Sequence, residues 1–343
     1  MGQGAADCQD AVTSVWCLAE MNVLIYGAGA VGLGVASCLL TAGVSVSIVA
    51  RKETADAISH LGINRSGIFG DAVHPPHDFF AADSLGRLTV SDYDCVLVCT
   101  KSFDTQAAGR DLKHHFGDSL NVPAIVLFQN GWGNREEISR WLPEDRIFNA
   151  RVITGFTRPD PAHVEITVHA NDIHIGHFSG KENRCISELC TAISAGGVPC
   201  SPTSAIVADL WAKMLYNCSL NSLGAVFEAS YGELADDPHS RALLDGIISE
   251  CFDVMTGAGF RTHWDSAETY QETFYSSLVP ATREHYPSTL QDIRAGKRTE
   301  IDALNGSVIK LAEAHFISAP FNWMAYNMVK YNETARHRTS PKP

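Results

Sequence analysis

Four short apolar runs within the first 130 residues alternate with stretches of helical patterning. They cover residues 22–26, 44–49, 94–99 and 124–128. Strands that are apolar on both faces belong to parallel sheets covered by helices, because both faces of the sheet must be buried. Repeated alternation of such strands with helices is typical of a doubly wound α/β domain. We therefore predict a domain of this class in the first part of the chain.

The patterning changes after residue 150. Residues 151–176 alternate polar and apolar side chains, as half-exposed antiparallel strands do. A segment rich in glycine and proline follows at residues 196–202, and beyond it the patterning is helical almost to the last residue. We predict one domain over residues 21–202 and an all-α domain over residues 203–335. Residues 1–20 match neither a secretory signal nor a myristoylation site, and we expect a disordered extension.

Composition limits the classes of function. The formal charge of −13 disfavours a nucleic-acid binder, because such a protein needs a basic face. No apolar run approaches the roughly 18 residues that a membrane span requires. The ten cysteines include no C-x-x-C pair, which favours reduced thiols and a cytoplasmic protein. The histidines lack the spacing of metal ligands, and we expect no metal site.

A G-x-G-x-x-G motif directly follows the first predicted strand and opens the next helix. Its residues are Gly27, Ala28, Gly29, Ala30, Val31 and Gly32. In this context the first glycine permits a tight turn, the second lets the backbone approach a pyrophosphate, and the third allows close helix–strand packing. We expect a Rossmann-type dinucleotide site here; a tight turn without a ligand is the alternative.

The end of the second strand indicates which dinucleotide binds. An NAD site usually has an acidic residue there, whereas this chain has Ala50, Arg51 and Lys52. Arg51 can hold a 2′-phosphate through two parallel charge-assisted hydrogen bonds, so we predict NADPH/NADP; a solvated basic pair is the alternative. Lys101 and Asn130 follow the third and fourth strands, at the sheet edge where open α/β sheets bind ligands.

Residues 208–221 are predicted to form a helix with a polar stripe. Lys213, Asn217 and Asn221 are spaced i, i+4, i+8 and therefore share one face. The rest of this helix is apolar, and asparagine is unfavourable in a helix interior because its amide competes with the backbone. The stripe indicates either the wall of a cleft or a narrow solvated seam.

A second polar segment covers residues 288–302. Gly296 is expected to end one helix, and Thr299 to cap the next. Glu300 would then lie in the first turn of that helix, where the helix dipole stabilises a carboxylate. Most glutamates in this position only cap helices, so this segment by itself indicates little about function.

These motifs together resemble those of the ketopantoate reductase (2-dehydropantoate 2-reductase) family. The similarity runs from residue 21 to about residue 313. Its elements, in order, are G-A-G-A-V-G, Arg51, T-K-S around Lys101, Q-N-G-W-G-N around Asn130, W-A-K-M-L-Y-N-C-S-L-N and S-T-L-Q-D-I-R-A-G-K-R-T-E-I-D-A-L-N-G. The resemblance implies a Rossmann domain followed by an all-helical domain like that of 6-phosphogluconate dehydrogenase, with the active site between them.

The resemblance also implies roles for individual residues. Lys213 matches the catalytic lysine and Glu300 its carboxylate partner. The substrate-binding positions match Asn130, Asn217, Asn221 and Ser288. The residues on the cofactor side match Lys101 and Asn130. The implied reaction is the NADPH-dependent reduction of 2-dehydropantoate to pantoate, in which a lysine ammonium stabilises the charge that develops on the ketone oxygen and supplies the proton.

One departure from the family concerns residues 285–287, where His-Tyr-Pro stands and the family often has an asparagine. The expected substrate is a small anionic 2-keto acid, and another 2-keto acid or aldehyde-acid is an open alternative. A non-catalytic sensor that binds NADPH is a third reading, against which the presence of both Lys213 and Glu300 argues. The sequence does not determine the oligomeric state, and a homodimer is left open.

Overall fold

The computed structural model describes residues 21–89, 92–117 and 121–339, with side chains described up to residue 335. The predicted extension at residues 1–20 lies outside the described residues. Contacts within the chain divide it into two compact units. Residues 21–129 and 135–206 form the N-terminal unit, and residues 130–134 and 207–339 form the helical unit. The sequence places residues 130–134 in the first domain, whereas their contacts place them in the helical unit.

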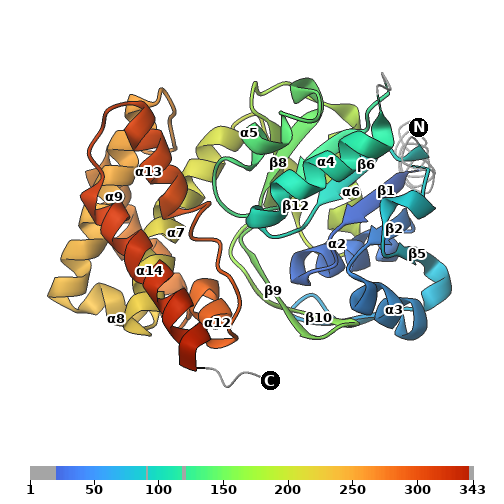
Figure 1. Ribbon diagram of the computed structural model, residues 1–343, viewed down its shortest axis with the longest axis horizontal. Helices are drawn as coiled ribbons and strands as arrows, with labels where there is room; N and C mark the ends of the chain where they lie inside the picture. Colours follow the sequence, from blue (N-terminus) through green and yellow to red (C-terminus); the bar gives the residue numbers. More distant parts are fainter. Residues whose placement is uncertain (1–20, 90–91, 118–120, 340–343) are drawn as a thin grey trace, which may run out of the picture. The chain divides into compact units, whose positions relative to one another are not determined.

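The N-terminal unit is built on an eight-stranded sheet in the order β12-β11-β8-β7-β6-β1-β2-β5 (Figure 1). The strands are β1 (Asn22–Tyr26), β2 (Ser45–Val49), β5 (Phe79–Ala82), β6 (Cys95–Val98), β7 (Ala124–Leu127), β8 (Ile147–Arg151), β11 (Ile173–His177) and β12 (Cys200–Pro202). All neighbouring strands are parallel except β8 and β11. The predicted doubly wound α/β class is confirmed, and each of the four predicted apolar runs contains one strand of this sheet.

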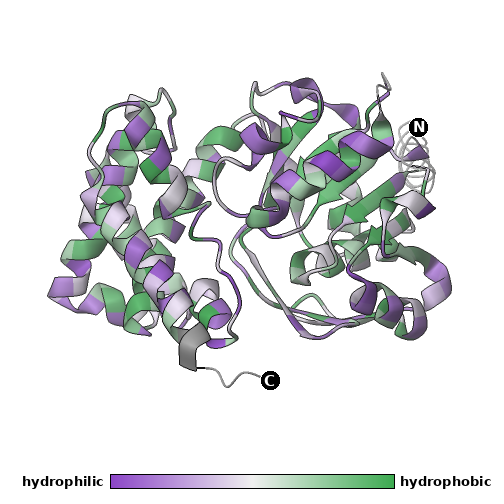
Figure 2. Cartoon of the chain, viewed as in Figure 1, coloured by the Kyte–Doolittle hydropathy of each residue, from purple (hydrophilic) through white to green (hydrophobic). Residues whose placement is uncertain are grey.

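Burial on both faces explains why these runs form a parallel sheet. Within β1, Val23 and Ile25 face one core cluster and Leu24 faces another. Figure 2 shows the strands of this sheet mainly in the hydrophobic colour. The first cluster includes residues of α2 (Ala30–Thr41) and α6 (Arg184–Ala195), and the second includes residues of α4 (Thr105–Phe116). Helices therefore cover both faces. The remaining helices of this region are α3 (Lys52–Leu61) and α5 (Asn134–Ile138).

A second, four-stranded sheet has the order β4-β3-β10-β9. Its strands are β3 (Ile63–Gly67), β4 (Ala72–His74), β9 (Thr154–Asp160) and β10 (His163–His169). β9 and β10 are antiparallel, as the alternation in residues 151–176 predicts. The last part of that segment forms β11, which instead joins the main sheet and is mostly buried.

The described residues of the helical unit contain no β-strand. Its helices are α7 (Ile206–Phe227), α8 (Tyr231–Asp236), α9 (Pro238–Gly257), α10 (Ala267–Thr273), α11 (Val279–Ala281), α12 (Ser288–Arg294), α13 (Asn305–Ala314) and α14 (Pro320–Thr339). α7 is apolar almost all round, and Trp211, Leu215 and Leu220 are fully buried. Within the part of the chain that the structure describes, no helix has the length and apolarity needed to cross a membrane.

Buried polar side chains tie the helices of this unit together. The carboxylate of Glu250 on α9 accepts hydrogen bonds from the backbone N–H groups of Phe321 and Asn322 at 2.8 Å each, and so caps the start of α14. The amide of Asn305 donates to Asn322 and to the carbonyl of Cys218 on α7, both at 3.0 Å. Four helices therefore share one hydrogen-bond network, which fixes their register.

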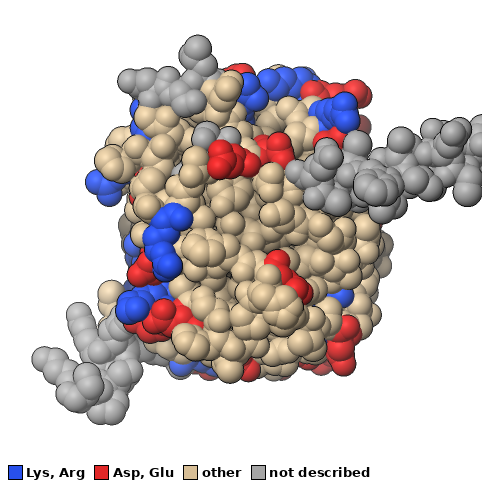
Figure 3. Space-filling model, turned by 90° about the vertical axis from the view of Figure 1, so that its right-hand side faces the viewer, with Lys and Arg blue, Asp and Glu red and all other residues tan. Residues whose placement is uncertain are grey.

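Charge on the surface is mixed. On the face shown in Figure 3, Lys and Arg side chains stand in small groups next to Asp and Glu, and uncharged residues cover most of the area. The described residues of that face form no broad basic surface of the kind that binds nucleic acid.

Candidate functional site

The glycine-rich loop joins β1 to α2. Gly27 has φ +111°, and a Cβ there would lie 2.8 Å from the backbone nitrogen of Thr100. A Cβ on Gly32 would lie 2.0 Å from the carbonyl oxygen of Gly27. These two glycines are therefore required by the turn and by the packing of the helix against the strand. At Gly29 the nearest atom to an added Cβ is 3.9 Å away, so packing does not require that glycine. The approach of a ligand to the backbone would explain it.

Arg51 lies at the end of β2 and is the N-cap residue of α3. Its side chain is 84 % exposed, and its guanidinium lies 3.7 Å from the carboxylate of Asp104. An ion pair this exposed contributes little to stability, so the arginine can turn to a phosphate at small cost. The structure thus leaves the predicted basic residue at the sheet edge accessible.

Lys101 is exposed and follows β6. Its backbone carbonyl accepts a hydrogen bond of 3.2 Å from the side chain of Gln129, which follows β7. Gln129 is buried and also donates to the hydroxyl of Thr105 at 2.9 Å. This glutamine therefore ties together the loops that leave two neighbouring strands.

The segment Asn130–Asn134 packs within the helical unit. The N–H of Trp132 donates to the carbonyl of Ala303 at 2.8 Å, and the hydroxyl of Ser307 donates to the carbonyl of Trp132 at 2.8 Å. The indole of Trp132 packs against that of Trp211 at a tilt of 38°, with ring centres 4.7 Å apart. Gly131 has φ +89°, and a Cβ there would lie 2.4 Å from the Ala303 carbonyl oxygen. The conformation of this segment is therefore tightly determined.

This segment brings Asn130 to the polar stripe of α7. The ammonium of Lys213 donates a hydrogen bond to the side-chain oxygen of Asn130. Asn217 and Asn221, one and two turns further along α7, are buried. The stripe is therefore not a solvated seam. Two predicted site residues, separated by 83 positions, are in direct contact here.

Asn221 is part of a cluster with two aromatic rings. The hydroxyl of Tyr231 donates to its side-chain oxygen at 2.7 Å, and Tyr231 is 3 % exposed. The ring of His285 lies 5.2 Å from that of Tyr231, and the carbonyl of His285 accepts from the Tyr231 N–H at 3.1 Å. Desolvation lowers the pKa of His285, which favours the neutral imidazole near pH 7. Sequence reasoning noted His285 as a departure from the family but missed Tyr231.

Ser288 is the first residue of α12 and is exposed. The residue before it, Pro287, packs against α7 where Gly224 lacks a side chain, since a Cβ there would lie 2.8 Å from the proline ring. This close approach places the start of α12 next to the helix that carries Asn217 and Asn221.

The prediction that Glu300 lies in the first turn of a helix is wrong. α13 begins at Asn305, and residues 301–304 form a turn. Thr299 caps this turn rather than a helix, because its hydroxyl accepts from the N–H of Ile301 at 3.3 Å. Tertiary hydrogen bonds explain the difference, because the buried carboxylate of Glu333 on α14 accepts from the N–H and the hydroxyl of Thr299, at 2.8 and 2.5 Å.

The other side of Glu300 is anchored in the same way. Asp302 accepts hydrogen bonds of 2.9 Å from Tyr326 on α14 and from Arg298. Burial opposes ionisation of Asp302, but these hydrogen bonds and the charge of Lys330 outweigh it and lower its pKa. Glu300, which is half-buried, therefore lies in a loop fixed at both ends by α14.

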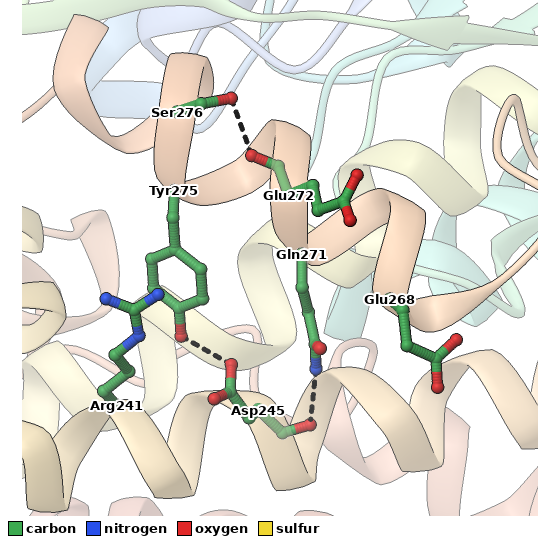
Figure 4. A pocket seen from close by; sticks show the side chains of 7 residues that line it. All are labelled: Arg241, Asp245, Glu268, Gln271, Glu272, Tyr275 and Ser276. Carbon is green, nitrogen blue, oxygen red and sulfur yellow. Dashed lines mark hydrogen bonds between the residues drawn. The ribbon is translucent and has the colours of Figure 1, made fainter.

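The described residues contain no group of three or more His, Cys, Asp or Glu side chains placed to hold a metal ion. An open hollow of about 690 Å³ lies in the helical unit (Figure 4). It is lined by Arg241, Asp245, Glu268, Gln271, Glu272, Tyr275 and Ser276. Its polar groups bind one another, since Arg241 lies over the ring of Tyr275 and Tyr275 donates to Asp245 at 2.6 Å. No predicted site residue lines it.

Comparisons with known proteins cover nearly the whole chain. Residues 23–180 match the family model described as ketopantoate reductase PanE/ApbA, and residues 205–333 match the model of its C-terminal domain. A relative from Aquifex aeolicus named 2-dehydropantoate 2-reductase is 34% identical over 91% of this chain and 97% of its own length. One from Shigella flexneri with the same name is 28% identical over 94% and 100%.

Solved structures agree with these matches. A PanE/ApbA family ketopantoate reductase from Ralstonia eutropha superposes with a TM-score of 0.78 at 27% identity, covering 92% of this chain and all of that one. A D-mandelate dehydrogenase solved with NADH and anilino(oxo)acetate also has a TM-score of 0.78, but at 18% identity it shows the fold alone. From the two family models and the relative at 34% identity, it follows that this chain belongs to the ketopantoate reductase PanE/ApbA family.

Proposed function

We propose that this chain is an NADPH-dependent 2-dehydropantoate 2-reductase, which transfers hydride to the ketone of 2-dehydropantoate and forms pantoate for the synthesis of pantothenate and coenzyme A. The observation that carries the proposal is the hydrogen bond from the Lys213 ammonium, on the polar stripe of the mostly apolar α7, to Asn130. Relatives covering more than nine-tenths of the chain carry this enzyme name, which supports the same assignment here.

Lys213 is the proposed proton donor. Hydride addition to a ketone builds negative charge on the ketone oxygen, and a positioned ammonium stabilises that charge and then delivers the proton. Asn130 holds Nζ through a neutral amide oxygen, so it orients the ammonium without neutralising it. Glu300 is the proposed carboxylate partner that keeps Lys213 charged when the substrate excludes water.

Asn217, Asn221 and Ser288 are the proposed substrate ligands. The side-chain oxygen of Asn221 already accepts from Tyr231, so its amide NH₂ is the group that can donate to the substrate. Neutral donors of this kind can hold the carboxylate of a keto acid without adding further charge near Lys213. The site then stabilises the charge that develops on the ketone oxygen more than the charge already present on the substrate.

The proposed cofactor residues are those of the glycine-rich loop with Arg51, Lys101 and Asn130. The accessible guanidinium of Arg51 favours a cofactor with a 2′-phosphate, which makes NADPH the proposed form. When bound, the nicotinamide supplies the hydride. All eight cysteines in the described ranges are free thiols, which supports a reducing, cytoplasmic location.

A second candidate is the reduction of a different 2-keto acid by the same chemistry. The aromatic contact between His285 and Tyr231, beside Asn221, favours it, because the family often has an asparagine near position 285. The corresponding substrate would be another 2-keto acid or an aldehyde-acid.

NADPH oxidation with 2-dehydropantoate, a panel of other 2-keto acids and the Lys213→Ala variant tests both candidates. We expect 2-dehydropantoate to be preferred, and kcat to fall by about a hundredfold to ten-thousandfold in the variant while NADPH binding is retained. Preference for another keto acid with the same loss in Lys213→Ala would support the second candidate. Tight NADPH binding without turnover of any keto acid would refute both and indicate a sensor.

A further inference from the structure

Arg158 brings a guanidinium group to the glycine-rich loop from a distant part of the sequence. Its Nη1 donates a hydrogen bond of 2.8 Å to the carbonyl oxygen of Ala28 and one of 3.4 Å to the hydroxyl of Thr54. Ala28 belongs to the dinucleotide motif. Thr54 lies in the first turn of α3, three residues after Arg51. Arg158 therefore contacts two of the elements that carry proposed cofactor residues, namely the glycine-rich loop and α3, which Arg51 caps.

The packing of β9 on α2 explains this position. A Cβ on Gly34 of α2 would lie 2.4 Å from the ring of Phe156, so only glycine lets that ring lie against the helix. Arg158 follows Phe156 by two residues in β9, at an irregularity where the register with β10 shifts. The contact between Phe156 and the helix brings this part of β9, and with it Arg158, to the loop at the start of that helix. Gly34 lies outside the dinucleotide motif, and its role is to admit β9.

The charge of Arg158 is not compensated locally. Both of its contacts, with a carbonyl and with a hydroxyl, are neutral, and among the described residues it forms no ion pair with a carboxylate. The side chain is exposed at the end of its strand. A guanidinium has five N–H donors, so two contacts leave donors as well as charge for an anion. The chain has a formal charge of −13, which repels anions. A cation beside the proposed dinucleotide loop would offset that repulsion at the place where phosphates bind.

We propose that Arg158 is a second arginine for the 2′-phosphate of NADPH, which it holds together with Arg51. The proposal rests on the NADPH assignment above. The contact with Thr54 places Arg158 at the β2–α3 junction, where Rossmann-type folds contact the 2′ position of the ribose. A pyrophosphate, by contrast, would be held at the start of α2, where backbone N–H groups are available to it. NADH lacks the 2′-phosphate, so Arg158 contributes to the choice between the two cofactors.

Binding of 2′,5′-ADP and of 5′-AMP to the full chain, measured by calorimetry, tests this role directly. We expect Arg158→Ala to weaken 2′,5′-ADP binding by about tenfold to a hundredfold and to leave 5′-AMP binding unchanged. Arg158→Lys keeps the charge but loses the planar fork, and its effect should be intermediate. The KM for NADPH should rise from the wild type to Arg158→Lys and again to Arg158→Ala, while the KM for NADH stays constant.

Arg184→Ala is the matched control, because it removes an equally charged and 83 % exposed arginine from α6 of the same unit. It should change neither affinity. Equal losses for both nucleotides in Arg158→Ala, or no loss at all, would overturn the proposal, since Arg158 would then only brace the loop. A wild-type protein without preference for 2′,5′-ADP would refute the NADPH assignment together with this role. Because binding requires no turnover, an incorrect keto acid leaves the test intact.

Discussion

Tyr231 donates a hydrogen bond of 2.7 Å from its buried hydroxyl to the side-chain oxygen of Asn221. This bond fixes which end of the Asn221 amide is available as a donor. It also accounts for a tyrosine in a position that is otherwise enclosed by aromatic rings, including that of Tyr216 at 5.6 Å.

Tyr231→Phe should raise the KM for the keto acid severalfold, because Asn221 is no longer held in one orientation. It should also lower the free energy of unfolding by about 1–3 kcal/mol, since a buried oxygen loses its donor. Steady-state kinetics and denaturant unfolding measure the two effects. Tyr216→Phe, which removes a hydroxyl bonded to Thr282 instead, is the control and should leave KM unchanged. Equal KM changes in both variants would argue against a role for Asn221.

Gly131→Ala should reduce both stability and kcat. The added Cβ would meet the Ala303 carbonyl oxygen at 2.4 Å, and the backbone has φ +89°, so the segment must shift and displace Asn130 from Lys213. Gly133→Ala is a matched control, because its φ is +92° but the nearest atom would be 3.9 Å away. The positive φ alone should lower the free energy of unfolding of Gly133→Ala by about 1–2 kcal/mol. Thermal unfolding and kcat of the two variants separate the effect of backbone strain from that of the clash with Ala303. Similar kcat values in the two variants would contradict the proposal that this segment positions Asn130.

Glu333→Ala should lower kcat although residue 333 is remote from Lys213 in sequence. Thr299 is fully buried, and its N–H and hydroxyl would both lose their acceptor, which loosens the loop that carries Glu300. The loss of buried hydrogen bonds should destabilise the protein by about 1–3 kcal/mol. Glu333→Gln keeps an acceptor oxygen and should retain most of the activity. If both variants kept the wild-type kcat, the loop would not need this anchor.

Stability should decrease as the pH falls below about 6.5. Burial and the charge of Arg65 lower the pKa of His74, whose ring bonds the hydroxyl of Ser37 at 3.0 Å. Because the unfolded chain takes up a proton at a higher pH than the folded one, this contribution is complete above the unfolded pKa and is lost as the pH falls towards the folded pKa. His74→Gln should flatten the dependence of the unfolding temperature on pH between about 7.5 and 5. A variant as pH-sensitive as the wild type would exclude His74 as the source.

The main sheet could be predicted from the sequence because its strands are buried on both faces. Residues 22–26 coincide with β1, since every side chain in the run is apolar or lies at an end. In the small sheet, the β9–β10 pair could be predicted from its alternation, but β3 and β4 could not: β3 reads I-N-R-S-G and β4 has three residues. Arg65 in β3 is buried because it donates to the carbonyl of Gly196 at 2.7 Å, a contact over 131 positions that no local pattern signals.

The site residues likewise fall into two groups, those that local spacing predicts and those that only tertiary packing brings to the site. Lys213, Asn217 and Asn221 could be grouped by helical spacing, whereas the contact of Lys213 with Asn130 depends on the packing of a loop. Arg158 gave no signal, because the Pro159 that follows it suggests a turn rather than a strand; proline is accepted here since β9 is an edge strand. What the sequence lacked in each case was the tertiary contact that positions the residue.

The two units cannot be separated by a single cut of the chain. Because residues 130–134 belong with the helices, the backbone passes from one unit to the other three times, after Gln129, after Asn134 and after Ile206. A fragment that starts at Val207 would lack the tryptophan that packs against Trp211, the donor to the Ala303 carbonyl and the acceptor for Lys213. Neither unit is a continuous stretch of polypeptide. Truncation at the apparent boundary would thus remove five residues from the unit that carries Lys213. A chimera that exchanges the helical unit between relatives would have to exchange residues 130–134 as well.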